Sequence, residues 1–260
     1  MRLDLTPPRL TPSCFQVWRR NLLVWRKLMV PSLLGNLADP TFYMLGLGFG
    51  IGALMPAIDG VPYITFLAAG TICYATMNSA TFEALYSAFS RMHVQRTWDS
   101  IMNAPVGLDD IVFAETMWAA SKSVLSGIAI LLLIWLLGLS HSPLTLWLIP
   151  LMLLMGVAFA SMAMVMTALA GSYDFFMYYF SLLVTPMVLL SGVFYPISAL
   201  PPLLQQVGAA LPLSHAIDLA RPLVYGRVPE DALLHLGVLA LYAIVGFMLA
   251  LILVRRRLLE

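Results

Sequence analysis

The residues that could carry out chemistry are few and lie far apart along the chain. The four histidines have none of the close spacings typical of metal ligands, and the two cysteines are 59 positions apart. No G-x-S-x-G, H-E-x-x-H or G-x-x-x-x-G-K-[ST] pattern is present. The sequence therefore argues against catalysis by this chain, and ATP could act on it only through a separate subunit. The scattered residues are His93, His141, His215, His235, Cys14 and Cys73.

Three acidic residues lie in or beside apolar segments, where a charge usually has a function or a partner. Asp39, Glu83 and Asp174 each lie toward an end of such a segment rather than at its centre. A proton or sodium relay would need an ionisable group near the middle of the membrane. We therefore expect these carboxylates to cap a helix end or to pair with an arginine.

The composition identifies the environment in which these residues must be placed. Of 260 residues, 61% are hydrophobic and only 10% are charged, and the mean hydropathy is +0.89. Soluble domains carry about 25% charged residues, so the chain is predicted to be an all-α membrane protein. Six stretches have the roughly 20 apolar residues that a spanning helix needs. These predicted spans are 32–55, 63–86, 111–139, 144–170, 175–194 and 234–254, all within one transmembrane domain covering 1–260.

The basic residues predict the orientation of these spans. Eleven of the 14 lysines and arginines precede the first span, lie between the second and third, or follow the sixth. The positive-inside rule then places both termini in the cytoplasm. The formal net charge is only +1, which gives no reason to expect nucleic-acid binding. We see no internal repeat of the kind found in secondary transporters.

Three further segments differ from plain spans. Residues 13–30 have an apolar face with three- and four-residue spacing and a basic face, which predicts an amphipathic helix in the cytoplasmic membrane interface. Residues 94–102 predict a short cytoplasmic helix with Trp98, Ile101 and Met102 as exposed apolar contacts for a partner. The proline-bounded segment 200–224 predicts two re-entrant or interfacial helices on the outer side.

The first span also carries two overlapping pairs of glycines four residues apart. Gly46 pairs with Gly50, and Gly48 pairs with Gly52. Such pairs allow two helices to approach closely. The partner could be another helix of the same chain, which we favour, or a helix of a second copy.

Two longer stretches resemble the permeases of type-2 ABC exporters. The first, SGVFYPISALPPLLQQVGAALPLSHAIDLAR at 191–221, is similar to the signature that precedes the last span in that family. The second, RTWDSIMNAPVGLDDIVFAETMWAASKS at 96–123, resembles the subgroup that exports lipo-chitooligosaccharide nodulation factors. The resemblance extends over nearly the whole chain.

This resemblance implies partners that the chain itself does not contain. Two permease chains, here two copies of this one, would pair in the bacterial inner membrane, and two ATP-binding subunits would bind ATP and Mg²⁺ beneath them. The short helix and the amino-terminal helix would contact those subunits. The residues implied in ATPase coupling are Arg96, Trp98, Asp99, Met102, Arg19 and Arg20.

The same resemblance implies a substrate path between the two permeases, next to spans one, two and five. The implied cargo is amphipathic, such as a lipo-oligosaccharide or related glycolipid or polysaccharide. Alternatives are an efflux permease for hydrophobic drugs, a membrane scaffold without an ATPase, and an ion-coupled transporter. The candidate path residues are Tyr43, Tyr74, Asn78, Glu83, Phe176, Tyr179 and Phe180.

Overall fold

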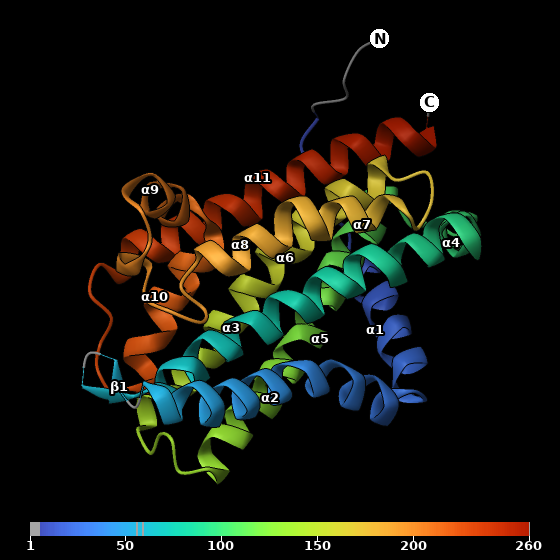
Figure 1. The fold of residues 1–260 in the computed structure, drawn as a ribbon. Helices are drawn as coiled ribbons and strands as arrows, with labels where there is room; N and C mark the ends of the chain where they lie inside the picture. The colour runs from blue at the N-terminus through green and yellow to red at the C-terminus, as the bar shows by residue number, and fades with distance from the viewer. Residues whose placement is uncertain (1–5, 56, 59, 260) are drawn as a thin grey trace.

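The computed structural model describes residues 6–55, 57–58 and 60–259, and nearly all of its regular structure is helical. The long helices run side by side between two ends (Figure 1). The terminal end holds α1, α4, residues 6–12 and the end of α11, whereas the distal end holds α9, α10 and the β1–β2 hairpin. The longer helices are α1 (Ser13–Arg26), α2 (Met29–Leu54), α3 (Tyr63–Phe82), α5 (Leu108–Leu136), α6 (Leu148–Leu169), α10 (Pro212–Val224) and α11 (Ala232–Leu259). The shorter elements are β1 (Ala57–Ile58), β2 (Val61–Pro62), α4 (Thr97–Met102), α7 (Phe175–Tyr179), α8 (Thr185–Leu190) and α9 (Pro202–Ala210).

Four helical segments are long and apolar enough to cross a membrane. They are Met29–Leu54, Leu108–Leu136, Pro143–Leu169 and Ala232–Leu259. The helix α3 is not among these four, because polar side chains lie among its apolar ones. The segment Phe175–Leu190 is apolar but shorter than the four. An all-α membrane protein is therefore confirmed, while the count of six spans, the cytoplasmic termini and the re-entrant course of 200–224 stay predictions.

The helices begin and end where the local sequence requires it. The α5 helix starts after Gly107, whose backbone N–H donates to the carboxylate of Asp110 in the first turn at 3.4 Å. Proline occupies the first turn of both α9 and α10, where its missing N–H costs nothing. Gly226 follows α10 with a φ of 76°, which a residue with a side chain rarely adopts.

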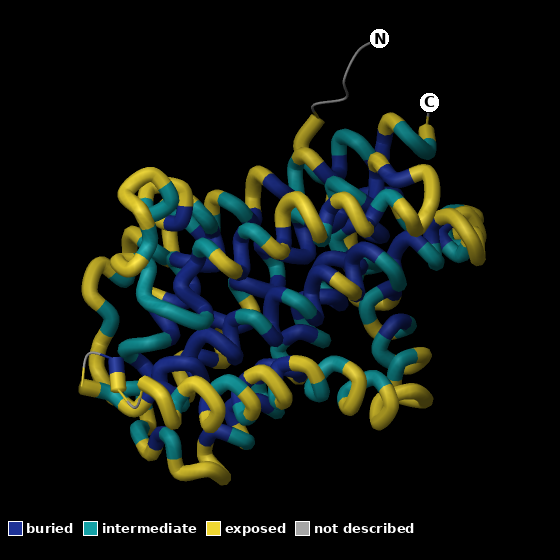
Figure 2. The backbone as a smooth tube through the Cα atoms, in the orientation of Figure 1, coloured by how far each residue is buried: buried dark blue, intermediate teal, exposed yellow. Residues whose placement is uncertain are grey.

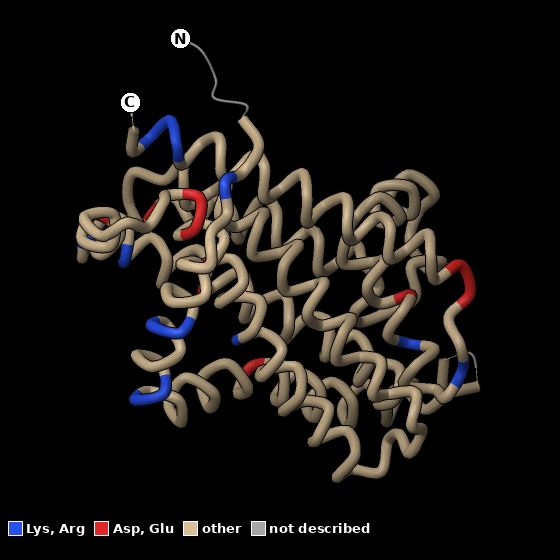
Figure 3. The backbone as a smooth tube through the Cα atoms, turned by 180° about the vertical axis from the view of Figure 1, so that it is seen from behind, with Lys and Arg blue, Asp and Glu red and all other residues tan. Residues whose placement is uncertain are grey.

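The core lies where α3, α5 and α6 pack against one another, with α11 against α6 and α2 on the outside of α3 (Figure 2). Two glycines allow the close packing. A Cβ at Gly127 of α5 would lie 2.8 Å from the Thr76 hydroxyl, and one at Gly156 of α6 would lie 2.9 Å from the Ala120 Cα. Charged residues gather toward the two ends of the bundle (Figure 3), as a membrane-embedded middle requires.

Candidate functional site: a buried ionic clamp behind α4

Two π-helical turns, Glu83–Ser87 and Ser90–Val94, continue α3 into the terminal end. A π-helical turn changes the direction in which the following side chains point and often occurs at functional sites. Here the turns direct Glu83 and Arg91 toward α5. The chain then reverses at Arg96, which has a left-handed φ of 49°, and α4 begins.

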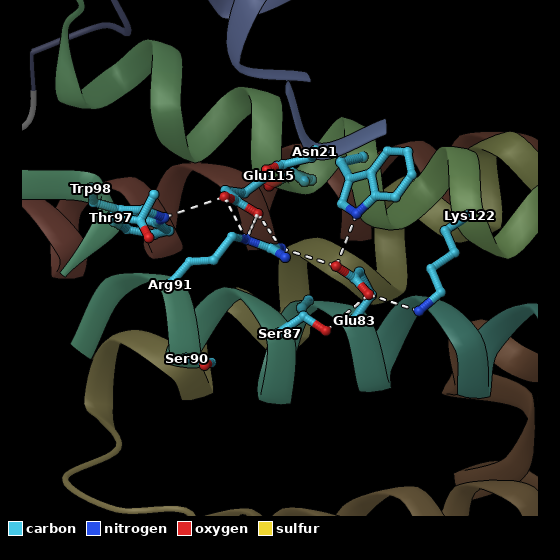
Figure 4. A network of polar contacts seen from close by, with 12 residues as sticks. Asn21, Glu83, Ser87, Ser90, Arg91, Thr97, Trp98, Glu115 and Lys122 are labelled. Atoms are coloured by element: carbon cyan, nitrogen blue, oxygen red, sulfur yellow. Dashed lines mark hydrogen bonds and ion pairs between the residues drawn. The ribbon is translucent and has the colours of Figure 1, made fainter. Parts of the chain in front are cut away.

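Side chains of the two π-helical turns, α4 and α5 meet in what we call the ionic clamp (Figure 4), consisting of Glu83, Arg91, Trp98, Glu115, Trp118 and Lys122. The Arg91 guanidinium donates from Nε to Glu115 Oε1 at 2.9 Å and from Nη2 to Glu83 Oε1 at 2.9 Å. Lys122 Nζ lies 2.8 Å from Glu83 Oε2. The Glu115 side chain is fully buried and that of Glu83 is 4% exposed, so each carboxylate depends on these cations for its charge compensation.

Two indoles complete the clamp. Trp118 Nε1 donates to Glu83 Oε1 at 2.9 Å, and Trp98 Nε1 donates to Glu115 Oε1 at 3.2 Å. The two carboxylates thus accept hydrogen bonds from α3, α4 and α5 together. Burial opposes the charge of Arg91, but Glu115 and Glu83 outweigh that effect and raise its pKa. Arg91 therefore stays charged, and its contacts with both carboxylates, together with the Trp98 indole, fix α4 to the long helices.

The position of Trp98 corrects our expectation of an exposed apolar contact. Its side chain is fully buried, because the reversal at Arg96 turns the indole inward to Glu115. Met102 is half-buried against the core. The exposed face of α4 is polar instead and presents Asp99 and Ser100, with Arg96 exposed just before it.

The helix α1 packs against the same region from the side. Its Trp18 and Trp25 rings lie 6.4 Å and 5.7 Å from the Trp118 ring. The Trp18 indole also donates to the Ser121 hydroxyl at 3.1 Å. Arg20 is half-buried next to the clamp, whereas its neighbour Arg19 is exposed.

A second ionic contact at the terminal end involves residues that the sequence analysis did not select. Arg255 of α11 donates to the Asp109 carboxylate from Nε at 2.9 Å and from Nη2 at 2.6 Å. Asp110 accepts from the backbone N–H and the hydroxyl of Thr11. The acidic pair therefore binds residues 6–12 and α11 to the start of α5. The adjacent Asp-Asp in a helix's first turn was the available signal.

The three acidic residues noted in the sequence have different surroundings. Glu83 pairs with Arg91, as expected. Asp174 directly precedes α7 and is exposed, and Asp39 is exposed on α2.

The candidate path residues fall into two groups along α3. Tyr74 contacts Tyr43 of α2, with ring centroids 6.1 Å apart. Farther toward the terminal end, Phe176 contacts Tyr86, and Phe180 contacts both Phe82 and Tyr86. Tyr179 is buried. Asn78 lies between the groups and is half-buried.

These contacts reveal a stripe on α3 that the sequence analysis found only in part. From residue 74 to residue 86, the side chains that are not buried include Tyr74, Asn78, Phe82 and Tyr86, spaced by four. Phe82 and Tyr86 were missed, although the four-residue spacing predicts that they share a face with Tyr74 and Asn78. Glu83 points away from this stripe into the clamp.

Comparisons with known proteins agree with this architecture. The profile of the ABC-2 type transporter family matches residues 13–225. Nodulation protein J of Rhizobium leguminosarum bv. viciae is 47% identical over 94% of both chains, and that of Bradyrhizobium diazoefficiens is 49% identical over 94% of this chain and 93% of its own. The inner membrane transport permease YadH of Escherichia coli is 22% identical over 92% of this chain and 93% of its own. The match over most of the chain, together with its apolar helices, identifies a multi-pass protein of the bacterial inner membrane that belongs to the ABC-2 type transporter family.

Proposed function

We propose that this chain is the membrane subunit of an ATP-driven exporter and that the exposed face of α4 binds a separate ATPase subunit. The observation that carries the proposal is the clamp, because it connects a short exposed helix to α3 and α5 through buried charges. A push on α4 would therefore move the long helices rather than bend a loop. Two ATPase subunits would bind ATP and Mg²⁺ and supply that push.

The division of α4 into a buried and an exposed face supports separate roles for its residues. Asp99 and Arg96 are exposed and would contact the ATPase, and Arg19, which is exposed on α1, would contact it as well. Trp98 is buried and would transmit the contact through Glu115. Met102 would hold α4 against the core.

We further propose that two copies of the chain pair through α2. The Gly48 Cβ position lies 2.8 Å from the Ile64 side chain, so that glycine face packs within the chain. Gly46 and Gly50 have nothing within 4 Å, and Phe42 and Phe49 on the same side of α2 are 72% and 64% exposed. This open apolar face with small residues suits a helix of a second copy.

The cargo would pass along that pair interface, next to the α3 stripe. Tyr43, Tyr74 and Asn78 offer aromatic faces and an amide to a sugar, and the phenyl rings of Phe82 and Phe180 offer apolar contacts to a chain. An amphipathic lipo-oligosaccharide fits such a lining, and the relatives' name, nodulation protein J, supports the same class.

The experiment is affinity purification of the tagged chain from gently solubilised membranes, with identification of its partners and assay of ATP hydrolysis. We expect a P-loop subunit in stoichiometric amount. The substitution Asp99→Arg should remove it, whereas Glu230→Arg, an equal charge reversal at an exposed distal position, should retain it. A chain that purifies without an ATPase would favour a scaffold or an ion-coupled transporter.

The pairing is tested by crosslinking in membranes. Gly46→Leu places a bulky side chain on the open face of α2 and should reduce the crosslinked dimer strongly. The control is Gly237→Leu on α11, where a Cβ also has nothing within 4 Å. Equal dimer yields for both variants would place the interface elsewhere.

A further inference from the structure

A polar cavity of about 540 Å³ lies beside the clamp at the terminal end. One wall is the corner between α1 and α2, from Arg20 to Ser32, and the opposite wall is the π-helical continuation of α3. Trp118 and Lys122 on α5 and Tyr173, which precedes α7, complete the lining. We call this space the basic cavity.

The basic cavity is lined by arginine and lysine side chains that have more hydrogen-bond donors than the clamp uses. Arg20 makes one side-chain hydrogen bond among the described residues, from Nη1 to the neighbouring Asn21 Oδ1 at 3.1 Å. Arg91 uses Nε and Nη2 in the clamp, and Lys122 uses one of its three ammonium protons on Glu83. Guanidinium and ammonium groups offer five and three donors. Several donors therefore remain for an acceptor within the cavity.

The charges at the cavity do not balance. Arg20, Arg91 and Lys122 give three positive charges against the two carboxylates of Glu83 and Glu115, which leaves one positive charge. Burial lowers the pKa of Arg20; Glu115 opposes this lowering, and Arg91 adds to it. An anion placed between Arg20 and Lys122 would offset this destabilisation of the Arg20 charge.

The cavity is also continuous with an apolar surface. Its lining includes Val24, Trp25 and Leu28, of which Val24 is 54% and Leu28 is 62% exposed. Apolar side chains beside a basic pocket suit a molecule with an acidic head and an apolar tail better than a free anion.

We propose that the basic cavity binds the phosphate group of an amphiphile, with Arg20 as the principal contact and with the tail along Val24 and Leu28. A phospholipid of the surrounding leaflet has this chemistry, and so does a phosphorylated lipid cargo. The binding does not depend on an ATPase, so it can be measured on the chain alone and fails or succeeds independently of the proposed transport function.

The experiment is native mass spectrometry of the purified full chain in a neutral detergent with an equimolar mixture of phosphatidylglycerol and diacylglycerol of matched chains, which differ in the phosphate group. We expect the chain to retain phosphatidylglycerol preferentially. Arg20→Gln should weaken this retention by about tenfold through loss of a charge-assisted contact. Arg20→Lys should largely preserve it. Arg19→Gln removes an equal charge from the exposed neighbouring position and should have little effect.

A second arm adds inorganic phosphate at matched ionic strength. If phosphate displaces the lipid, the cavity recognises the phosphate group itself; if it does not, the tail along α1 and α2 contributes to recognition. Equal retention of the two lipids by the unmodified chain, or equal losses in Arg19→Gln and Arg20→Gln, would overturn the proposal. Thermal unfolding of each variant verifies that its fold is intact.

Discussion

The terminal and distal ends of the bundle are held together by different kinds of contact. At the terminal end, carboxylates of α3 and α5 bind guanidinium and ammonium groups in the clamp, and Asp109 binds Arg255 of α11. At the distal end, side chains bind backbone carbonyls: Arg221 donates to Gly192 O at 2.7 Å, and Ser140 donates to Val224 O at 2.7 Å. His215 and His235 also share a hydrogen bond there, with 2.7 Å between their Nδ1 atoms.

The difference predicts which end would move as a rigid unit and which end would separate more easily. Separating the partners of a buried charge network costs much free energy, because each charge would lose its compensation. The terminal end should therefore move as a rigid unit. Hydrogen bonds to carbonyls and between two histidine rings cost less to break. In an exporter, this arrangement would deliver a push on α4 to helices whose far ends can separate.

The largest effect should come from breaking the clamp. Glu115→Ala leaves Arg91 with one carboxylate and leaves the Trp98 indole without its acceptor. We expect the free energy of unfolding in detergent to fall by about 3–5 kcal/mol, as for other buried ion pairs that lose one partner. Glu230→Ala at an exposed distal position is the control and should change it by less than about 0.5 kcal/mol. Similar values for the two variants would remove the contrast between the ends.

A smaller effect should follow at the distal end from Arg221→Lys. The guanidinium lies 3.9 Å above the Phe66 ring and donates to Gly192 O, and an ammonium group reproduces neither geometry. We expect a loss of about 1–2 kcal/mol in the same unfolding measurement. A loss as large as that of Glu115→Ala would show that the distal end is fixed as firmly as the clamp.

The smallest effect should be a pH dependence at the histidine pair. Burial, aided by His235, lowers the pKa of His215, while Asp218 and a backbone carbonyl oppose this. The unfolded chain therefore binds more protons than the folded chain as the pH falls below about 6.5, and stability decreases. Burial raises the pKa of Asp218, although His235, Arg221 and His215 oppose this rise. Protonation of Asp218 affects stability at a lower pH than protonation of His215. We expect His215→Gln to reduce the change in melting temperature between about pH 7 and about pH 5.5. If the melting temperature of His215→Gln changed with pH as much as that of the unmodified chain, His215 would not be the source of this pH dependence.

The sequence was most informative where a single physical constraint dominates. Apolar runs predicted the long helices, because a chain in lipid must satisfy its backbone internally. The terminal prolines of α9 and α10 predicted two short helices in 200–224. The pairing of Glu83 with an arginine also followed, since a buried carboxylate needs a cation.

The rest depends on geometry that the residue pattern does not contain. The inward position of Trp98 follows from the π-helical turns before α4 and from the left-handed Arg96, neither of which has a clear sequence signal. The meeting of Glu115 with Arg91 depends on how α3 and α5 pack. The division of the glycines into a packed face at Gly48 and an open face at Gly46 depends on the rotation of α2.

The most direct test is transport of a labelled lipo-chitooligosaccharide, the proposed cargo class, by the chain reconstituted with the proposed ATPase subunit, with hydrolysis measured in parallel. Trp98→Phe removes the indole donor to Glu115 together with part of the buried ring, and Trp135→Phe makes the same change at an indole bonded to Thr145 at the distal end. We predict that Trp98→Phe retains the ATPase and its hydrolysis but transports several-fold less cargo per ATP, while Trp135→Phe transports normally. Equal transport per ATP in the two variants would contradict coupling through the clamp.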